Sequence, residues 1–447
     1  MMKRHAKLLI CIVAAAAAGG CAPGAGRGAF DDLARTEAAS GYAPRNRKLP
    51  ALNENAALKE YLRYAALNNP GLEAAFNRWK AALERVPQVT SLPDPRFIYR
   101  YYIEQVETRT GPQRHSVAVS QTFPWFGKLK LRGDAALAAA NAEKARYEAA
   151  KLKLFYRVQD AYHELGYLGR AVAIVRENRD LAKYIERVAR KRYEGDVGTH
   201  HDVIRAQVEL GKLEDRLLAV IDLREPITAR LNAALNRPIN AELPWPARPP
   251  LEETNATDEQ ILAWLGKASP ELKALEHEIA KRRHAVELAK KNYYPDITLG
   301  LTHIDTGNGR DPAIAMASIN LPIWYAKYRA ADREAEARLR AAVLQRTDKE
   351  NSLGSTAKMA LYRFRDAGRK ANLYRDTLVP KAKQSLKATQ AAYSSGKASF
   401  LDLIDAQRIL LEFQLSYERA LANRAQRLAE IETLVGRKIT DNVREDK

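Results

Sequence analysis

The residues best suited to metal chemistry are the adjacent histidines His200 and His201, followed directly by Asp202. Imidazole and carboxylate groups bind transition metals. Adjacent residues of a helix point about 100° apart, however, so these two imidazoles would not readily share one ion. His277 and His284 lie seven residues apart with acids nearby, where a packed or exposed helix face is the favoured interpretation. We therefore predict no metal site and no cofactor.

Motifs for other kinds of catalysis are absent from the sequence. It contains no glycine-rich phosphate loop, no serine nucleophile elbow and no His-Glu-x-x-His helix. We therefore expect a protein that is not an enzyme. Its two cysteines, Cys11 and Cys21, both lie close to the N-terminus, which leaves no cysteine for a disulfide or a metal elsewhere in the chain.

The N-terminus has the pattern of an export signal. Three positive residues precede the apolar stretch Leu8–Ala18, which is too short to span a bilayer, since spanning needs about 20 residues. The run Ala18-Gly19-Gly20-Cys21 then resembles a lipoprotein signal-peptidase site. We predict that residues 1–20 are a lipoprotein signal peptide and that Cys21 is the lipidation site, acylated for instance with palmitate. An ordinary signal peptide, cut elsewhere, is the alternative.

The chain is strongly basic, with a formal net charge of +19. Such a charge can indicate binding to nucleic acid or to an anionic membrane. Here basic residues alternate with acids, as in Glu186-Arg187. That pattern favours solvated helix faces over a binding patch, and we expect no nucleic-acid partner.

An internal duplication organises the chain. Shifting Tyr193–Leu210 by 200 residues places it on Tyr393–Leu410 with six identical pairs, and the same shift places Pro95 on Pro295. A fixed offset that recurs at separated places indicates a repeat. The predicted organisation is a lipidated N-terminal linker, a first repeat, a proline-rich connector, a second repeat and a tail, over residues 21–53, 54–236, 237–257, 258–437 and 438–447.

Each repeat shows the same order of elements. A helix comes first, over about 54–88 and again over about 258–292, and is followed by two strands with period-two alternation. The strands are expected at about 96–106 and 115–123, and at about 296–304 and 313–321. A long helical hairpin with coiled-coil spacing then follows, over 128–236 and 324–437. The predicted fold is mainly α, with a duplicated helix–β-hairpin–long helical hairpin.

The strands have the properties of a membrane β-barrel. They are about nine to eleven residues long and alternate apolar with polar residues, as Leu299 and Thr298 do. Four strands cannot close a barrel, and an open edge in lipid leaves backbone groups unpaired. We therefore expect several chains to pool their strands. The alternative is two short hairpins lying on a soluble helical body.

The duplicated plan, the helix starts at Asn69-Pro70 and Ser269-Pro270, and the spacing from Tyr393 to Ala406 resemble the TolC family of outer-membrane efflux factors. The resemblance covers roughly residues 54–437. It implies a homotrimer with a 12-stranded β-barrel in the outer-membrane lipid, continuous with a long periplasmic α-helical tunnel. With the predicted lipid on Cys21, the trimer would also be lipid-anchored. It also implies two further partners, a periplasmic membrane-fusion adaptor and an inner-membrane pump, with the resistance–nodulation–division type favoured.

The same resemblance places the functional residues at the two helical turns. Tyr393 and Asp202 fall where a hydrogen bond would close a periplasmic gate, and Lys397 and Asp196 are the alternative gate residues. The family often has a gating arginine where this chain has Ala398. The adaptor is expected to dock on the turn residues Gly195, Gly198, Gly396 and Ser399. For Tyr393, packing against the returning helix is an equally favoured role.

Substrate is indicated only by Phe123–Lys128, which is similar to the corresponding segment of the heavy-metal branch of the family. It favours metal cations as cargo for a passive outer-membrane outlet. A strand-to-helix corner with two interfacial aromatic residues would explain the same segment. An outlet for drug efflux or for type I protein secretion is the alternative, as is, in another class, a periplasmic adaptor or structural coiled-coil lipoprotein.

Overall fold

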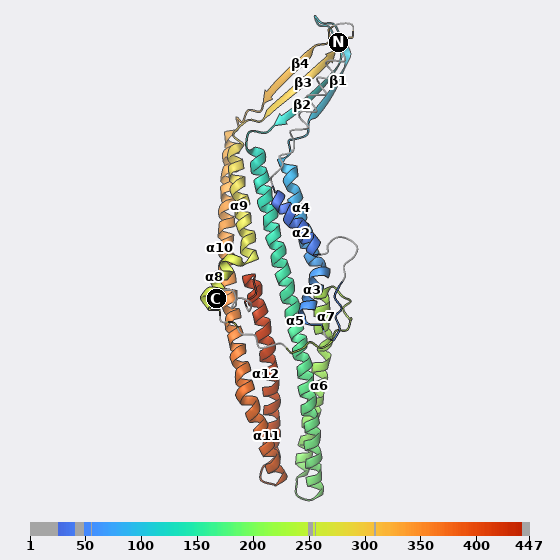
Figure 1. Cartoon of the computed structure of the whole chain (residues 1–447), viewed down its shortest axis with the longest axis vertical. Helices are drawn as coiled ribbons and strands as arrows, with labels where there is room; N and C mark the ends of the chain where they lie inside the picture. Colours follow the sequence, from blue (N-terminus) through green and yellow to red (C-terminus); the bar gives the residue numbers. More distant parts are fainter. Residues whose placement is uncertain are drawn as a thin grey trace. The chain divides into compact units, whose positions relative to one another are not determined.

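The computed structural model describes residues 26–40, 49–54, 56–248, 254, 256–307 and 310–439. They form long helices and one four-stranded sheet (Figure 1). The chain divides into two compact units. The first is built from the described residues of Met1–Ala39, Ala75–Tyr147 and Glu271–Lys349, and the second from those of Ser40–Ala74, Glu148–Pro270 and Glu350–Lys447. Cys21 and residues 440–447 lie outside the described residues.

The elements follow the predicted duplicated order. The first repeat contains α3 (Leu58–Asn68), α4 (Pro70–Thr90), β1 (Arg96–Val106), β2 (Gln113–Phe123), α5 (Lys128–Glu194), α6 (His200–Asp222) and α7 (Arg224–Leu235). The second contains α8 (Asp258–Ala268), α9 (Pro270–Lys291), β3 (Ile297–Asp305), β4 (Ala313–Ile319), α10 (Tyr325–Leu373), the π-helical turn η1 (Tyr374–Leu378), α11 (Val379–Ser394) and α12 (Phe400–Val435). No helix among the described residues is both long enough and apolar enough to cross a membrane.

The first helical span of each repeat, outlined in the sequence over about 54–88 and 258–292, is not one continuous helix, and its break falls at the predicted helix starts Asn69-Pro70 and Ser269-Pro270. It is two helices, separated at Asn69 and at Ser269, whose ψ angles of 119° and 120° are not helical. Both residues precede a proline, whose ring excludes the helical conformation of the residue before it. In the first repeat Asn69 also caps the start of α4, because its side-chain Oδ1 accepts a hydrogen bond from Leu72 N at 3.0 Å.

The returning arm of the helical hairpin predicted over 128–236 is also interrupted, at Leu223, where α6 ends and α7 begins. In the second repeat, η1 ends at Leu378, two residues before Pro380 in the first turn of α11. A proline lacks the N–H that an α-helix needs, and a single π-turn can absorb that loss.

A second correction concerns the predicted N-terminal linker, because part of it is the helix α2 (Arg27–Ser40). Its Leu33 is buried. Two ion pairs attach it to the first unit: Lys144 Nζ lies 2.7 Å from Asp32 Oδ2, and Lys80 Nζ lies 3.0 Å from Glu37 Oε1. The predicted linker therefore contains an amphipathic helix that packs on the rest of the first unit. The apolar residues Phe30 and Leu33, three positions apart, could have indicated this helix.

The sheet has the strand order β1-β2-β3-β4, and every neighbouring pair is antiparallel. The two hairpins, one from each repeat, meet through β2 and β3 in nine residue pairs. This register confirms the predicted alternation. Residues that pair across strands share a face, and one face carries mostly apolar residues: Phe97, Tyr99, Val117, Val119, Leu299 and Leu301. Several of them are exposed in the single chain, including Phe97 at 66% and Leu299 at 49%.

Candidate functional site at the helical turns

Two helical hairpins of the second unit, α5–α6 and α11–α12, pack together near their turns (Figure 1). All four helices contribute to one apolar cluster, which includes Ile185, Val203, Leu386 and Phe400. Each returning helix starts at a hydroxyl N-cap: Thr199 and Ser399 accept from the backbone N of Asp202 and Asp402. Such caps satisfy otherwise unpaired backbone donors and fix where each turn ends.

The turn glycines differ in what the backbone requires of them. The left-handed residues are Gly396 (φ 77°) and, at the equivalent place in the first repeat, Asp196 (φ 56°). Gly195 is therefore not required as a turn former, and a Cβ there would make only ordinary contacts. A Cβ on Gly198, by contrast, would lie 3.0 Å from the Cβ of Arg192, so this glycine is needed for close approach.

Tyr393 is a core residue of this bundle rather than an exposed turn residue. Its side chain is 3% exposed and contacts Phe400, with ring centroids 5.8 Å apart. Burial raises the pKa of the Tyr393 phenol, the Asp202 carboxylate adds to this effect, and Arg192 opposes it. The packing role considered from the sequence is therefore present.

The predicted hydrogen bond between Tyr393 and Asp202 is not formed in this conformation. The Tyr393 hydroxyl is buried and has no hydrogen-bond partner among the described residues, although the Asp202 charge is close enough to affect it. Asp196 and Lys397 lie exposed in the two turns, and neither forms an ion pair with another described residue. The structure thus brings Tyr393 and Asp202 together, but leaves both alternative gate residues in solvent.

Arg192 is the residue at the turns that the sequence analysis missed. Its guanidinium lies over the Tyr393 ring, with Cζ 4.6 Å from the centroid. It donates to the carbonyl oxygen of Tyr393 and makes a longer contact of 3.5 Å with that of Val197. Arg192 and Tyr393 are 201 residues apart in sequence. Only the offset of the two repeats could have indicated that they meet.

Ion pairs also connect the two returning helices, α6 and α12, farther from the turns. Arg408 Nε lies 3.0 Å from Glu209 Oε2, and Arg216 Nη1 lies 2.6 Å from Glu412 Oε1. The hydrogen bond from Arg408 is the main reason that the pKa of Glu209 is lowered. The two hairpins are therefore joined by an apolar core and by charged pairs along α6 and α12.

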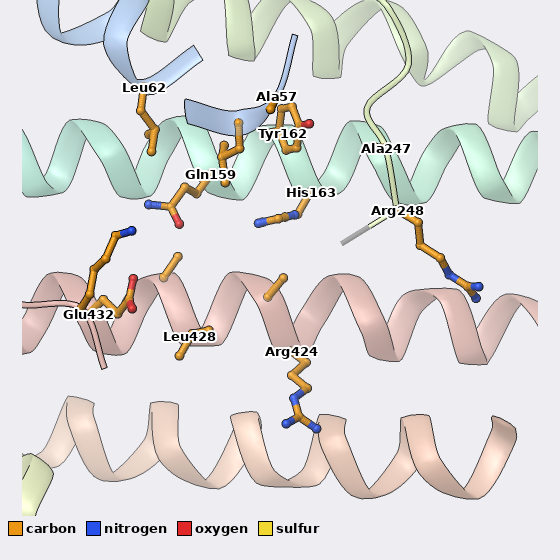
Figure 2. Close-up of a pocket in the computed structure, with 14 residues that line it drawn as sticks. Ala57, Leu62, Gln159, Tyr162, His163, Ala247, Arg248, Arg424, Leu428 and Glu432 are labelled. Carbon is orange, nitrogen blue, oxygen red and sulfur yellow. The ribbon is translucent and has the colours of Figure 1, made fainter. Parts of the chain in front are cut away.

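A cavity of about 360 Å³ in the same unit is lined by α3, α5, α12 and the connector (Figure 2). His163 lies on its wall, 8% exposed, and its Nδ1 has no hydrogen-bond partner among the described residues. Burial lowers the pKa of His163 to about 4. No group of three or more potential metal ligands occurs in the described parts of the chain, so we assign no chemistry to this cavity.

The low pKa of His163 predicts a loss of stability in mild acid. As pH falls below about 6.5, His163 becomes protonated in the unfolded state, whereas in the folded state it stays neutral until about pH 4. Acid therefore favours the unfolded state. By pH 5 the loss is about 2 kcal/mol per chain. Thermal unfolding, followed by helical circular dichroism between pH 7 and 5, should show this slope, and His163→Leu should flatten it. Gln159→Leu, which replaces a polar but non-titrating residue of the same cavity wall, is the control and should keep the slope.

The segment Phe123–Lys128 makes several contacts where β2 meets α5 in the first unit. Trp125 stacks on Tyr294, with ring centroids 5.3 Å apart and planes 13° apart. The buried Lys128 Nζ lies 2.7 Å from Asp296 Oδ1 and 2.9 Å from the carbonyl oxygen of Tyr294. Asp296 Oδ1 also accepts from Trp125 N at 2.9 Å. These contacts join the first repeat to the start of β3 and give the segment a structural role.

Comparison with known proteins identifies the family. The family described as outer membrane efflux protein matches residues 62–237 and 265–437. The chain belongs to the outer membrane efflux protein family. It is an outer-membrane efflux channel protein, and therefore a conduit rather than an enzyme. The fold class and the family predicted from the sequence are confirmed.

Two characterised relatives are similar along most of their length. The cobalt-zinc-cadmium resistance protein CzcC of Cupriavidus metallidurans is 22% identical over 392 residues, covering 85% of this chain and 90% of CzcC. Nodulation protein T of Rhizobium leguminosarum bv. trifolii is 22% identical over 403 residues, covering 85% of each chain.

Solved structures show the same fold. CusC, described for its transmembrane channel formation, has a TM-score of 0.75 at 16% identity, with 88% of this chain and 99% of CusC covered. The outer-membrane channel OprN has a TM-score of 0.73 at 17% identity, with 89% of this chain and 95% of OprN covered. VceC of Vibrio cholerae has a TM-score of 0.72 at 20% identity, with 86% and 96% covered.

Proposed function

We propose that three copies of this chain form one outlet, with a 12-stranded β-barrel in the outer membrane and a helical tunnel reaching into the periplasm. The observation that carries the proposal is the four-stranded sheet. Among the described residues its end strands, β1 and β4, each pair on one side only, and one of its faces is apolar and exposed. An unpaired edge in lipid costs several kcal/mol for each unsatisfied group, so edges of neighbouring copies would pair and close the barrel.

Reconstitution tests this assembly directly. The purified chain in detergent should have the mass of a trimer by light scattering, and it should produce ion-conducting channels in planar bilayers. A monodisperse monomer without channel activity would contradict the proposal.

We further propose that the cargo is divalent metal cations, expelled by an inner-membrane pump of the resistance–nodulation–division type through a periplasmic adaptor. CzcC, by its name, serves resistance to cobalt, zinc and cadmium, and it is similar over most of both chains. A deletion strain should lose tolerance to these cations and keep its tolerance to drugs. A strain that loses drug tolerance alone would assign the outlet to the alternative cargo.

The adaptor would dock on the turns that contain Gly195, Gly198, Gly396 and Ser399.

Lipid anchoring at Cys21 is a separate proposal, supported by the small residues that precede this cysteine. Cys21→Ser should abolish acylation, as intact-mass spectrometry would show. The protein should remain in the outer membrane, because one lipid adds little to a chain whose barrel already spans the bilayer. Loss of membrane localisation in Cys21→Ser would count against the barrel itself.

The gate proposal places a hydrogen bond from Tyr393 to Asp202 in the closed trimer. The buried Tyr393 hydroxyl lacks a partner in the present conformation, and a charge-assisted bond would be worth about 1.5–3 kcal/mol. Tyr393→Phe should therefore raise the open probability of single channels and leave trimer stability intact. Tyr193→Phe, at the equivalent but exposed position of the first repeat, is the control. An equal open probability in both variants would mean that Tyr393 is only a packing residue.

A further inference from the structure

Arg192 connects two hairpins that no covalent bond joins at this end. It lies in the last turn of α5, and its guanidinium donates to the carbonyl oxygen of Tyr393, next to the last residue of α11. The same guanidinium covers the Tyr393 ring at 4.6 Å and reaches Val197 in the α5–α6 turn at 3.5 Å. One side chain thus contacts the end of α11 and the turn of the other hairpin.

The electrostatic setting explains why a cation occupies this position. Helices α5 and α11 both end here, and the C-terminus of a helix carries partial negative charge. Arg192 forms no ion pair with any carboxylate in the described parts of the chain, so the charge of its guanidinium is met by carbonyl oxygens and by the Tyr393 ring. Without the cation, two like-charged helix ends would lie close together.

Both turns approach this side chain, and the α5–α6 turn does so closely. A Cβ on Gly198 would lie 3.0 Å from the Arg192 Cβ, and a Cβ on Gly396 would lie 3.9 Å from Arg192 Nη2. The Arg192 Nε is buried without a hydrogen-bond partner among the described residues. This unpaired donor limits how strongly the contact holds, so the contact can be released without a large cost.

We propose that Arg192 is a positioning residue that holds the end of α11 against the α5–α6 turn and thereby sets the width of the channel entrance. The proposal rests on the outlet function proposed above and adds to it a contact between hairpins that is independent of the Tyr393 hydroxyl. Releasing the Arg192 contact lets the α11–α12 hairpin move away from the α5–α6 hairpin at the turns.

Removing this side chain should leave the bundle folded. The apolar cluster shared by the four helices stays intact, as do the pairs Glu209–Arg408 and Arg216–Glu412 along α6 and α12. The change is therefore confined to the last helical turns. Arg190 provides the matched control, because it lies two residues away, is exposed and pairs with Glu186 on its own helix.

Single-channel recording is the first test. Arg192→Ala should raise the population of the open state about tenfold, equivalent to about 1.4 kcal/mol, and Arg190→Ala should leave it unchanged. Arg192→Lys should restore closure only in part, because an ammonium keeps the charge but loses the planar stacking and paired donors of a guanidinium. A wild-type population of the open state in Arg192→Ala would overturn the proposal.

A distance measurement makes the test independent of conduction. Nitroxide labels at Glu194→Cys and Ser395→Cys, one at each turn, report the separation of the hairpins in trimers diluted with unlabelled chain. In the Arg192→Ala background the distance distribution should shift and broaden, and in Arg190→Ala it should match the wild type. An unchanged distribution in Arg192→Ala contradicts the proposal even if the protein conducts. A clear shift in a protein that does not conduct supports the Arg192 contact and counts against the outlet function.

Discussion

Replacing Leu299 by arginine is expected to block insertion of the barrel. Leu299 belongs to the apolar face of the sheet and is 49% exposed in the single chain. In the assembled outlet that face meets lipid, where an arginine near the middle of the bilayer costs about 2–4 kcal/mol. The cost is repeated in each of three chains. The heat-resistant trimer should therefore disappear from outer-membrane extracts of Leu299→Arg cells.

Thr298→Arg is the matched control, one residue away on the opposite face. Its side chain lies beside Thr122, with 2.9 Å between the two hydroxyl oxygens. The substitution loses about 1 kcal/mol from that hydrogen bond and places the new charge towards the polar lumen. Trimer should be recovered in Thr298→Arg. If both variants insert equally well, the apolar face does not meet lipid.

The strands and their faces could be predicted because the signal is local. Period-two alternation assigns Leu299 and Thr298 to opposite faces before any partner strand is known, and the register confirmed it. The turns were equally accessible, since Thr199 and Ser399 are ordinary N-cap residues next to glycine-containing runs. The helix breaks were readable as well, because Asn69 and Ser269 each precede a proline.

Contacts between the repeats could not be predicted in the same way. The Arg192–Tyr393 contact depends on how two hairpins pack, and no local pattern marks Arg192 among the neighbouring basic residues. The resemblance directed attention to Ala398, where an arginine is often found, whereas the arginine at this end of the bundle comes from the other hairpin. The resemblance also predicted a hydrogen bond from the Tyr393 hydroxyl to Asp202. The sequence can indicate that two residues lie close together, but it does not give the rotamers that decide whether they bond.

The segment Phe123–Lys128, which suggested the heavy-metal branch of the family, also has a structural role. Its Trp125 stacks on Tyr294, and its Lys128 binds Asp296. These contacts join the end of β2 and the start of α5 to the segment before β3. The ion pair within these contacts makes a prediction about stability.

Lys128→Met is expected to destabilise the chain by about 3 kcal/mol, because breaking one partner of a buried ion pair leaves the other charge uncompensated. The Lys128 side chain is 4% exposed and that of Asp296 is 29% exposed, so solvent screens the remaining carboxylate only in part. Lys130→Met, at an exposed position on the same helix, should have little effect. Lys128→Met combined with Asp296→Asn should recover much of the loss, since the amide oxygen can still accept from Trp125 N without a charge. Thermal unfolding of the detergent-solubilised protein measures all three variants. Equal stability of Lys128→Met and Lys130→Met would mean that this junction is held by the Trp125–Tyr294 stack and not by the charge pair.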